Sequence, residues 1–171
     1  DRKHLLLCSP TGSGKTLTAF LTVIDKLVRM ALDGKLKKKV HCVYISPIKA
    51  LANDIQRNLI GPLTEISERY LPDRAQEIKV GLRTGDTPQS ERQRMLKHPP
   101  HILITTPESL AIAITSPKFQ RIVSELEYMS VDELHSLVPT KRGVHLGLTL
   151  SYLDTLLQTP VQRIGISATM E

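Results

Sequence analysis

Residues 4–16 read HLLLCSPTGSGKT, an apolar run followed by a glycine-rich loop and the first residues of a helical segment. Glycines let backbone N–H groups turn toward phosphate oxygens, and the N-terminus of a helix adds positive potential there. Lys15 is expected to reach the β- and γ-phosphates of a nucleotide, and Thr16 to offer its hydroxyl to Mg²⁺. The pattern therefore predicts a phosphate-binding loop whose ligand-binding residues are Thr11, Gly12, Ser13, Gly14, Lys15 and Thr16.

The loop departs from the usual G-x-x-x-x-G-K-[ST] pattern at one position, because Ser9 stands where the first glycine is expected. A glycine-rich turn at the start of a helix, with an exposed lysine, would look similar in sequence. The strand-like run before the loop and the helical spacing after it favour the phosphate site.

Short apolar runs recur along the whole chain and alternate with longer stretches of helical spacing. The runs are His4–Cys8, Val40–Ser46, Ile78–Leu82, His101–Thr105, Tyr128–Val131 and Gln162–Ser167. Their Val, Ile and Leu content predicts strands that are buried on both faces. The alternation predicts an α/β fold: one domain over residues 1–171, with a mainly parallel, doubly wound sheet sandwiched by helices.

Helical spacing also predicts which residues face the core. In the first helix, Thr16 to Leu32, the apolar side carries Leu17, Phe20, Leu21, Ile24, Leu27, Val28 and Ala31. In the segment from Gly143 to Leu157 it carries Val144, Leu148, Tyr152, Leu153, Leu156 and Leu157. A third helix, which starts near Leu51, is expected to be interrupted at Gly61-Pro62, because proline lacks the backbone N–H donor.

The composition narrows the class of protein further. The hydrophobic fraction of 40% is enough for a packed core, and 23 basic against 17 acidic residues leave a net charge of +6, which favours an anionic partner. Two cysteines cannot by themselves form a disulfide framework or a tetrahedral zinc site. No apolar run approaches the roughly 20 residues of a membrane span. We expect a monomeric domain in the cytoplasm with no membrane partner.

An acidic pair, Asp132-Glu133, ends the fifth apolar run. The carboxyl ends of strands are where α/β sheets bind ligands. There, one carboxylate can steady Mg²⁺ while the other orients or deprotonates an attacking water. Acidic residues also favour the first turn of a helix, so a capping role is the alternative. Together with the phosphate loop, the pair favours a nucleoside triphosphatase.

Four more motifs follow the predicted strands: ISPIKALA at residues 45–52, RTGD at 83–86, TTPESL at 105–110 and SAT at 167–169. In this order, around the phosphate loop and DELH at 132–135, they resemble the first RecA-like domain of superfamily 2 helicases over essentially the whole chain. Three segments, residues 46–59, 85–92 and 141–146, are similar to the large helicase-related (Lhr) group.

The resemblance implies a RecA-like P-loop NTPase domain and a role for each matching residue. Its catalytic residues would be Lys15, Asp132 and Glu133, with ATP as the nucleotide and with Mg²⁺ held by Thr16 and Asp132. The segments that touch the nucleic-acid backbone would supply Pro47, Lys49, Arg83, Thr84, Gly85, Thr106, Pro107 and Glu108. Coupling of nucleotide state to strand movement would use His135, Ser167 and Thr169.

For the longer protein, the resemblance implies an ATP-dependent helicase or translocase that moves 3′-to-5′ on single-stranded DNA in DNA repair. A second RecA-like domain of the same polypeptide would supply arginines to the transition state, so this domain alone should be nearly inactive. An RNA helicase lobe, a P-loop phosphotransferase and a binding fragment without turnover are the alternatives.

The mode of nucleic-acid binding can be inferred from the aromatic content. With two Phe, four Tyr and no Trp, the chain has few side chains on which splayed bases could stack. The motif loops offer hydroxyls, glycine N–H groups and cations instead, which suit phosphates and sugars. We therefore expect sequence-independent, salt-sensitive binding. For Lys141 and Arg142, a DNA contact and an interdomain salt bridge are both open.

Overall fold

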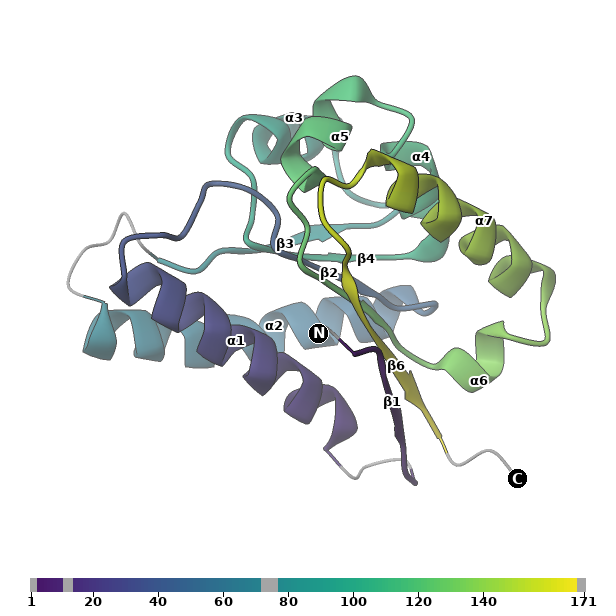
Figure 1. Ribbon diagram of the computed structural model, residues 1–171, viewed down its shortest axis with the longest axis horizontal. Coiled ribbons are helices and arrows are strands. Elements are labelled where there is room, and N and C mark those ends of the chain that lie inside the picture. The colour runs from purple at the N-terminus through teal and green to yellow at the C-terminus, as the bar shows by residue number, and fades with distance from the viewer. Residues whose placement is uncertain (1–2, 11–13, 72–76, 169–171) are drawn as a thin grey trace.

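The core of the fold is one parallel β-sheet with helices on both faces (Figure 1). The structure, a computed structural model, describes residues 3–10, 14–71 and 77–168. The strands within these residues are β1 (Leu5–Cys8), β2 (Cys42–Ile45), β3 (Val80–Arg83), β4 (Ile102–Thr105), β5 (Tyr128–Val131) and β6 (Gln162–Ser167). They lie in the order β1-β6-β5-β2-β4-β3 and every neighbouring pair is parallel, which confirms the predicted α/β fold.

Two groups of helices enclose the sheet (Figure 1). One face is covered by α1 (Lys15–Leu32) and α2 (Lys49–Tyr70), and the other by α3 (Gln89–Lys97), α4 (Pro107–Ala113), α5 (Pro117–Val123) and α7 (Lys141–Leu156). A short helix, α6 (Leu134–Leu137), lies between β5 and α7. Each face of the sheet has its own apolar cluster, so the central strands are buried from both sides. No helix in the described part of the chain is long and apolar enough to cross a membrane.

Burial on both faces is confirmed for β2, β4 and β5, in which every residue is buried. The prediction holds only in part for β6, in which Ile164, Ile166 and Ser167 are buried and the rest are half-buried, and it is wrong for β1 and β3. In β1, Leu5 and Leu6 are 47% and 54% exposed, and β3 is only partly buried along its length. Within the described residues, each of these strands pairs on one side only, since β1 and β3 are the two edges of the sheet. An edge strand has fewer neighbours to cover it.

The predicted interruption at Gly61-Pro62 is also wrong, because α2 continues through Pro62 to Tyr70. Pro62 lies on the exposed side of α2, where a carbonyl that loses its helical partner can bond to water instead. On the opposite side, Leu59 and Leu63 are buried one turn apart on either side of the proline. Packing against the sheet thus holds the helix together across this position.

The core-facing sides of α1 and α7 differ in part from the predicted ones. In α1, Leu17 and Leu21 are exposed, whereas the buried side is made by Ala19, Phe20, Val23, Ile24, Leu27 and Ala31. In α7, the predicted residues Val144, Leu148 and Tyr152 are exposed, and the buried side is made by Leu146, Thr149 and Leu153. Apolar residues lie on two sides of α7, so spacing alone could not identify the side that packs.

The carboxyl ends of the strands share one edge of the sheet, because all of the strands are parallel. Across that edge, the segments that follow β1, β6, β5, β2, β4 and β3 begin with Ser9, Ala168, Asp132, Ser46, Thr106 and Thr84. The described residues that directly follow these strands in the phosphate loop, in DELH and in the motifs after β2, β3, β4 and β6 therefore lie on the same edge.

Candidate functional site

The phosphate loop joins β1 to α1 at this edge. Gly14 caps α1 at a φ of 78°, a left-handed conformation that favours glycine. From the first residue of α1, Lys15 Nζ donates hydrogen bonds to the carbonyl oxygens of Ser9 and Pro10, the latter at 2.9 Å. The ammonium group therefore lies against the loop backbone. The predicted ligands Thr11, Gly12 and Ser13 lie outside the described residues.

The predicted magnesium ligands meet across the sheet edge. Thr16 Oγ1 is 3.4 Å from Asp132 Oδ2, although the two residues are far apart in sequence. No cluster of three or more His, Cys, Asp or Glu side chains that could hold a metal occurs in the described ranges. Magnesium in phosphoryl-transfer sites is usually held by one or two protein oxygen ligands together with phosphates of the substrate. The hydroxyl and the carboxylate fit a Mg²⁺ ion of that kind.

Tyr44 of β2 binds and orients the Asp132 carboxylate. Its hydroxyl donates to Asp132 Oδ2, while the backbone N–H of Glu133 donates to Oδ1 at 2.7 Å. The Tyr44 side chain is buried, and its ring lies 4.7 Å from that of Phe20 between centroids. Burial, followed by the negative charge of Asp132, raises the pKa of the Tyr44 phenol far above its ordinary value. The hydroxyl therefore stays protonated and fixes the carboxylate.

We expect the Tyr44→Phe substitution to weaken Mg²⁺ binding, because the carboxylate would lose the donor that orients it. Loss of such a supporting hydrogen bond typically costs about 10–100-fold in metal affinity or activity. The midpoint of a Mg²⁺ titration of nucleotide binding measures the effect. Tyr70→Phe is the matched control, since Tyr70 is 57% exposed at the end of α2. An unchanged midpoint in Tyr44→Phe would rule out this role.

Glu133 stands at the turn between β5 and α6. Among the described residues, it is the one non-glycine residue with a positive φ, at 51°. Such conformations cost roughly 1–3 kcal/mol and concentrate at functional sites. The left-handed turn directs Glu133 away from Asp132, the first residue after β5, and the two carboxylates differ in exposure: Asp132 is buried, whereas Glu133 is half-buried. That difference suits a metal ligand next to a general base.

His135 connects Glu133 to the end of β6. Its Nε2 is 3.0 Å from Glu133 Oε2, and its Nδ1 accepts a hydrogen bond from the Ala168 N–H at 3.0 Å. Ser167 Oγ lies 3.3 Å from the same Nδ1. Because a backbone N–H donates to Nδ1, the ring hydrogen is on Nε2 and points at the carboxylate. Glu133, His135 and Ser167 thus form one connected group. The other predicted coupling residue, Thr169, lies outside the described residues.

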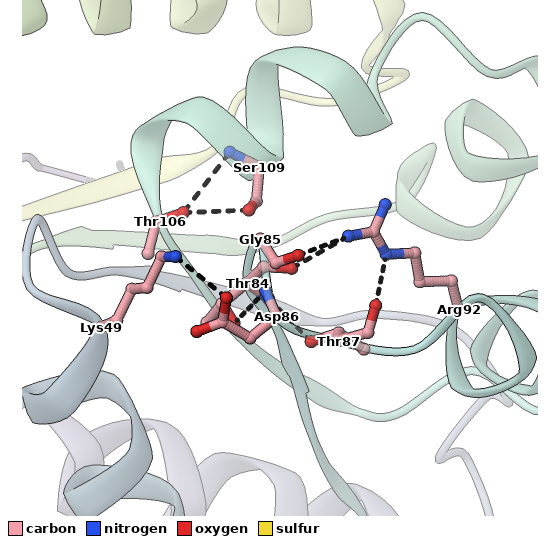
Figure 2. A network of polar contacts seen from close by, with 8 residues as sticks. All are labelled: Lys49, Thr84, Gly85, Asp86, Thr87, Arg92, Thr106 and Ser109. Atoms are coloured by element: carbon pink, nitrogen blue, oxygen red, sulfur yellow. Dashed lines mark hydrogen bonds and ion pairs between the residues drawn. The ribbon is translucent and has the colours of Figure 1, made fainter.

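The predicted nucleic-acid residues lie at the end of β3 or in the segments after β2, β3 and β4, which are neighbours in the sheet. The side chains of Pro47, Thr84, Thr106 and Pro107 are buried, so they shape the loops from within. Thr106, for example, caps α4 by accepting from the Ser109 N–H (Figure 2). The exposed members are Lys49, Gly85 and Glu108.

Lys49 and the loop after β3 lie side by side, as Figure 2 shows. Lys49 Nζ makes an ion pair with Asp86 Oδ1 at 3.1 Å. A Cβ atom on Gly85 would lie 3.3 Å from that Nζ, so glycine leaves room for the lysine. The N–H groups of Thr84, Asp86 and Thr87 already donate within the loop, so the group here that suits phosphate oxygens is the exposed Lys49 ammonium.

Arg92 of α3 braces the loop after β3 (Figure 2). Its Nε donates to the Thr87 carbonyl at 2.9 Å, and its Nη2 donates to the carbonyls of Thr84 and Gly85, both at 3.2 Å. No role for Arg92 was predicted from the sequence. Its position in residues 85–92, shared with the Lhr group, was the only signal.

Arg83 differs from the other predicted nucleic-acid residues in the direction of its side chain. The guanidinium lies over the ring of Phe119, 5.7 Å from its centroid, on the face covered by α5. Burial, followed by the positive charge of Arg92, lowers the pKa of Arg83. Arg83 could therefore contact a nucleic-acid backbone only through its main chain, or after its side chain rearranges.

The strand order divides the edge into two halves. The ATP half contains the phosphate loop, the acidic pair and the His135 group (Glu133, His135 and Ser167), at the ends of β1, β5 and β6. The nucleic-acid half contains the predicted nucleic-acid loops at the ends of β2, β3 and β4. Strands β5 and β2 are neighbours, so the two halves meet between Asp132 and Ser46. The two halves are therefore directly adjacent along the edge.

Comparison with known proteins is consistent with this geometry. Residues 1–171 match the family described as DEAD/DEAH box helicase. The chain is 54% identical over 169 residues to the ATP-dependent helicase Lhr-Core of Methanothermobacter thermautotrophicus, a match that covers 98% of this chain and 20% of that protein.

Two solved structures are similar in fold as well as in sequence. The Mycobacterium smegmatis helicase Lhr bound to ssDNA and AMP-PNP has a TM-score of 0.86 and 46% identity, over 98% of this chain and 21% of that one. The DUF1998 helicase MrfA bound to DNA and AMPPNP has a TM-score of 0.75 and 30% identity, over 98% of this chain and 22% of that one. The present chain thus spans about a fifth of each of these proteins.

Proposed function

This chain belongs to the DEAD/DEAH box helicase family, and we propose that it is the ATP-binding motor lobe of a longer nucleic-acid helicase or translocase. The RecA-like fold and the resemblance to the Lhr group expected from the sequence are both confirmed. The observation that carries the proposal is the shared edge, where Lys15, Thr16, Asp132 and Glu133 lie beside the loops of the nucleic-acid half.

ATP hydrolysis at this edge would use each residue in a separate role. Lys15 and the N-terminus of α1 would offset the negative charge of the phosphates. Thr16 and Asp132 would hold Mg²⁺, which, when bound, neutralises charge that develops on the phosphate oxygens. Glu133 would accept a proton from the water that attacks the γ-phosphorus, and the bond from that phosphorus to the β–γ bridging oxygen would break. The products are ADP and inorganic phosphate.

Single-stranded DNA is the nucleic acid that we propose as partner. The solved Mycobacterium smegmatis relative was bound to ssDNA, and this chain is 46% identical to it. The exposed predicted residues of the nucleic-acid half are Lys49, Gly85 and Glu108, whose carboxylate is paired with Arg142, and none of them is aromatic, which favours contact with phosphates and sugars. Single-stranded RNA is the alternative, and it would contact the same loops. Movement in the 3′-to-5′ direction and a role in DNA repair stay predictions.

We further propose a second RecA-like domain in the same polypeptide as the partner of this lobe. The Lhr-Core helicase and the solved Lhr helicase compared above are each about five times as long as the chain. A second domain could bring cationic side chains to the γ-phosphate from the open side of the edge. A monomeric state and a cytoplasmic location, where ATP and nucleic acid are both available, remain part of the same proposal.

The Lys15→Ala substitution tests the proposed site. We expect ATP hydrolysis to fall by roughly 10²–10³-fold, the usual cost of removing one preorganised donor from a transition state, and ATP binding to weaken as well. Steady-state hydrolysis and equilibrium binding of ATP with Mg²⁺ measure the two effects. Lys38→Ala is the matched control, because Lys38 is exposed on the connection before β2, at the opposite edge of the sheet. Normal ATP binding by Lys15→Ala would remove the proposed site.

A comparison of ATPase rates with and without nucleic acid separates the proposed function from a phosphotransferase. Protein that includes the second domain should hydrolyse ATP faster when single-stranded DNA is added, and the effect should weaken with rising salt. Transfer of phosphate to a small acceptor, without any response to DNA or RNA, would contradict the motor. A larger response to RNA than to DNA would favour the RNA helicase.

A further inference from the structure

Arg142, in the first turn of α7, binds two segments of the nucleic-acid half at once. Its Nε and Nη2 donate to Glu108 Oε1 and Oε2 at 2.6 and 3.1 Å. The same Nη2 also donates to the carbonyl oxygen of Pro47 at 3.0 Å. One guanidinium therefore joins α7 to the loop after β2 and to α4, which follows β4.

The start of α7 is built to hold Arg142 in this place. Thr140 caps the helix by accepting from the Gly143 N–H at 3.2 Å, and its hydroxyl donates to the Leu137 carbonyl at 2.7 Å. A Cβ atom on residue 143 would lie 2.1 Å from the same carbonyl oxygen, so only glycine allows α7 to start directly against α6. This close approach explains the glycine at position 143, directly after Arg142.

The segment that ends at Arg142 begins at the ATP half of the edge. Glu133 is the N-cap of α6, and Leu137, the last residue of that short helix, is 1% exposed in the apolar core. From Glu133 to Arg142 the chain thus consists of one helical turn, a capped bend and the first turn of α7. A shift of α4 or of the Pro47 loop would act on the proposed general base, Glu133, through this short, packed connection.

The observed contacts of Arg142 lie within the domain. Its Nε and Nη2 donate to Glu108 and to the Pro47 carbonyl, so these donors are held by the domain itself and not by DNA or another domain. The hydrogen bonds from Arg142 are the largest cause that lowers the pKa of Glu108, so that carboxylate stays negative and has its counter-charge beside it. Without Arg142, Glu108 would present an unneutralised charge to an approaching phosphate backbone.

Thermodynamic stability does not explain the arrangement. The Arg142 and Glu108 side chains are 47% and 54% exposed, and exposed pairs add little to folding stability. What the pair does fix is geometry, because a two-point guanidinium–carboxylate contact defines both distance and angle.

We propose that Arg142 is a positioning residue that couples binding of the nucleic-acid strand to ATP hydrolysis at Glu133. The inference rests on the proposed function of the chain as a motor lobe. Strand binding at the loops after β2 and β4 would move or stiffen Pro47 and Glu108, and Arg142 would convey this change through α6 to Glu133. Arg142 itself touches neither ATP nor the strand.

The test uses the full-length protein that contains this chain, with single-stranded DNA as the probe. In Arg142→Ala, the ratio of ATPase rates with and without DNA should fall by roughly 5–150-fold, the range of typical coupling between sites. Arg142→Lys should restore only part of the ratio, since lysine cannot make the two-point contact and reach the Pro47 carbonyl together. Arg121→Ala, an exposed arginine of α5, is the matched control and should keep the wild-type ratio.

A second measurement separates coupling from a structural defect. Linkage requires that ATP and DNA change each other's affinity by the same factor. We expect AMP-PNP to change the Kd for DNA in the wild type and to have little effect in Arg142→Ala. In addition, Arg142→Gln combined with Glu108→Gln should impair the ratio no more than the worse single variant, because the two residues act as a unit.

Two outcomes for Arg142→Ala would overturn the inference. One is a wild-type ratio of the ATPase rates with and without DNA. The other is an equal fall of these two rates while AMP-PNP still changes the affinity for DNA as in the wild type. Failure of the proposed function would look different. If the wild-type protein showed no DNA or RNA dependence, or if Lys15→Ala hydrolysed ATP normally, the motor assignment itself would be wrong, whatever Arg142 does.

Discussion

Replacing Glu133 by glutamine should lower the kcat of DNA-stimulated ATP hydrolysis by roughly 10²–10⁴-fold, the usual contribution of a general base. Glutamine has nearly the same size and can still accept the hydrogen bond from His135 Nε2, so the turn into α6 should be kept. It cannot take the proton of the attacking water at neutral pH. Binding of ATP with Mg²⁺ should therefore persist while turnover is lost.

Paired measurements on one preparation test this expectation: steady-state release of phosphate and equilibrium binding of a fluorescent ATP analogue. Glu65→Gln is the matched control, because Glu65 is exposed on α2, which covers one face of the sheet. Near-normal turnover in Glu133→Gln would show that another group takes the proton. Loss of nucleotide binding together with turnover would point to a collapsed site instead of a missing base.

The largest expected difference is between this chain alone and protein extended through the second RecA-like domain. Without arginines from that domain, the kcat for ATP should be lower by about 10³–10⁵-fold, which is the effect of an arginine finger in related phosphoryl-transfer systems. The physical reason lies in the geometry of the edge, where Lys15 is the one lysine or arginine predicted to contact the phosphates. Single-turnover hydrolysis with Mg²⁺ measures both proteins on the same scale.

The comparison is meaningful only if the short chain folds, so a cooperative thermal transition and a helical circular dichroism spectrum are the required controls. The difference should remain at saturating ATP, because the missing arginines act in the transition state and weaker binding alone cannot account for it. Equal kcat values for the two proteins would show that one lobe holds the whole catalytic apparatus.

Much of the fold could be predicted because its signals are local. Each predicted strand overlaps an observed one, and the runs at Tyr128–Val131 and Gln162–Ser167 match β5 and β6 residue for residue. The errors share one cause. Continuation of α2 through Pro62 and the exposure of Val144 and Leu148 depend on what lies opposite each helix, which spacing within a helix does not report.

The candidate site divides in the same way. Lys15, Thr16 and the acidic pair are recognisable because their chemistry needs certain residue types at short, fixed spacings. Tyr44 carries no such pattern, because it acts through Asp132, 88 residues away, on an element that only the fold brings close. Arg92 and Arg142 lie in segments that resemble the Lhr group, but the groups that they bind were not predictable from those segments. A tyrosine inside an apolar strand and an arginine in the first turn of a helix both look ordinary in sequence.

The sequence by itself determined the class of protein and the kind of chemistry at the carboxyl ends of its strands, because loops, caps and apolar runs are set by neighbouring residues. Only the tertiary structure decided which strands are neighbours. The pairing of β1 with β6, the first strand with the last, brings the phosphate loop next to Ser167 of the His135 group. The pairing of β2 with β5 joins the two halves of the edge. Backbone hydrogen bonds can pair any two strands. The strand order is therefore set by the helices, which must bury their apolar sides on one face of the sheet or the other.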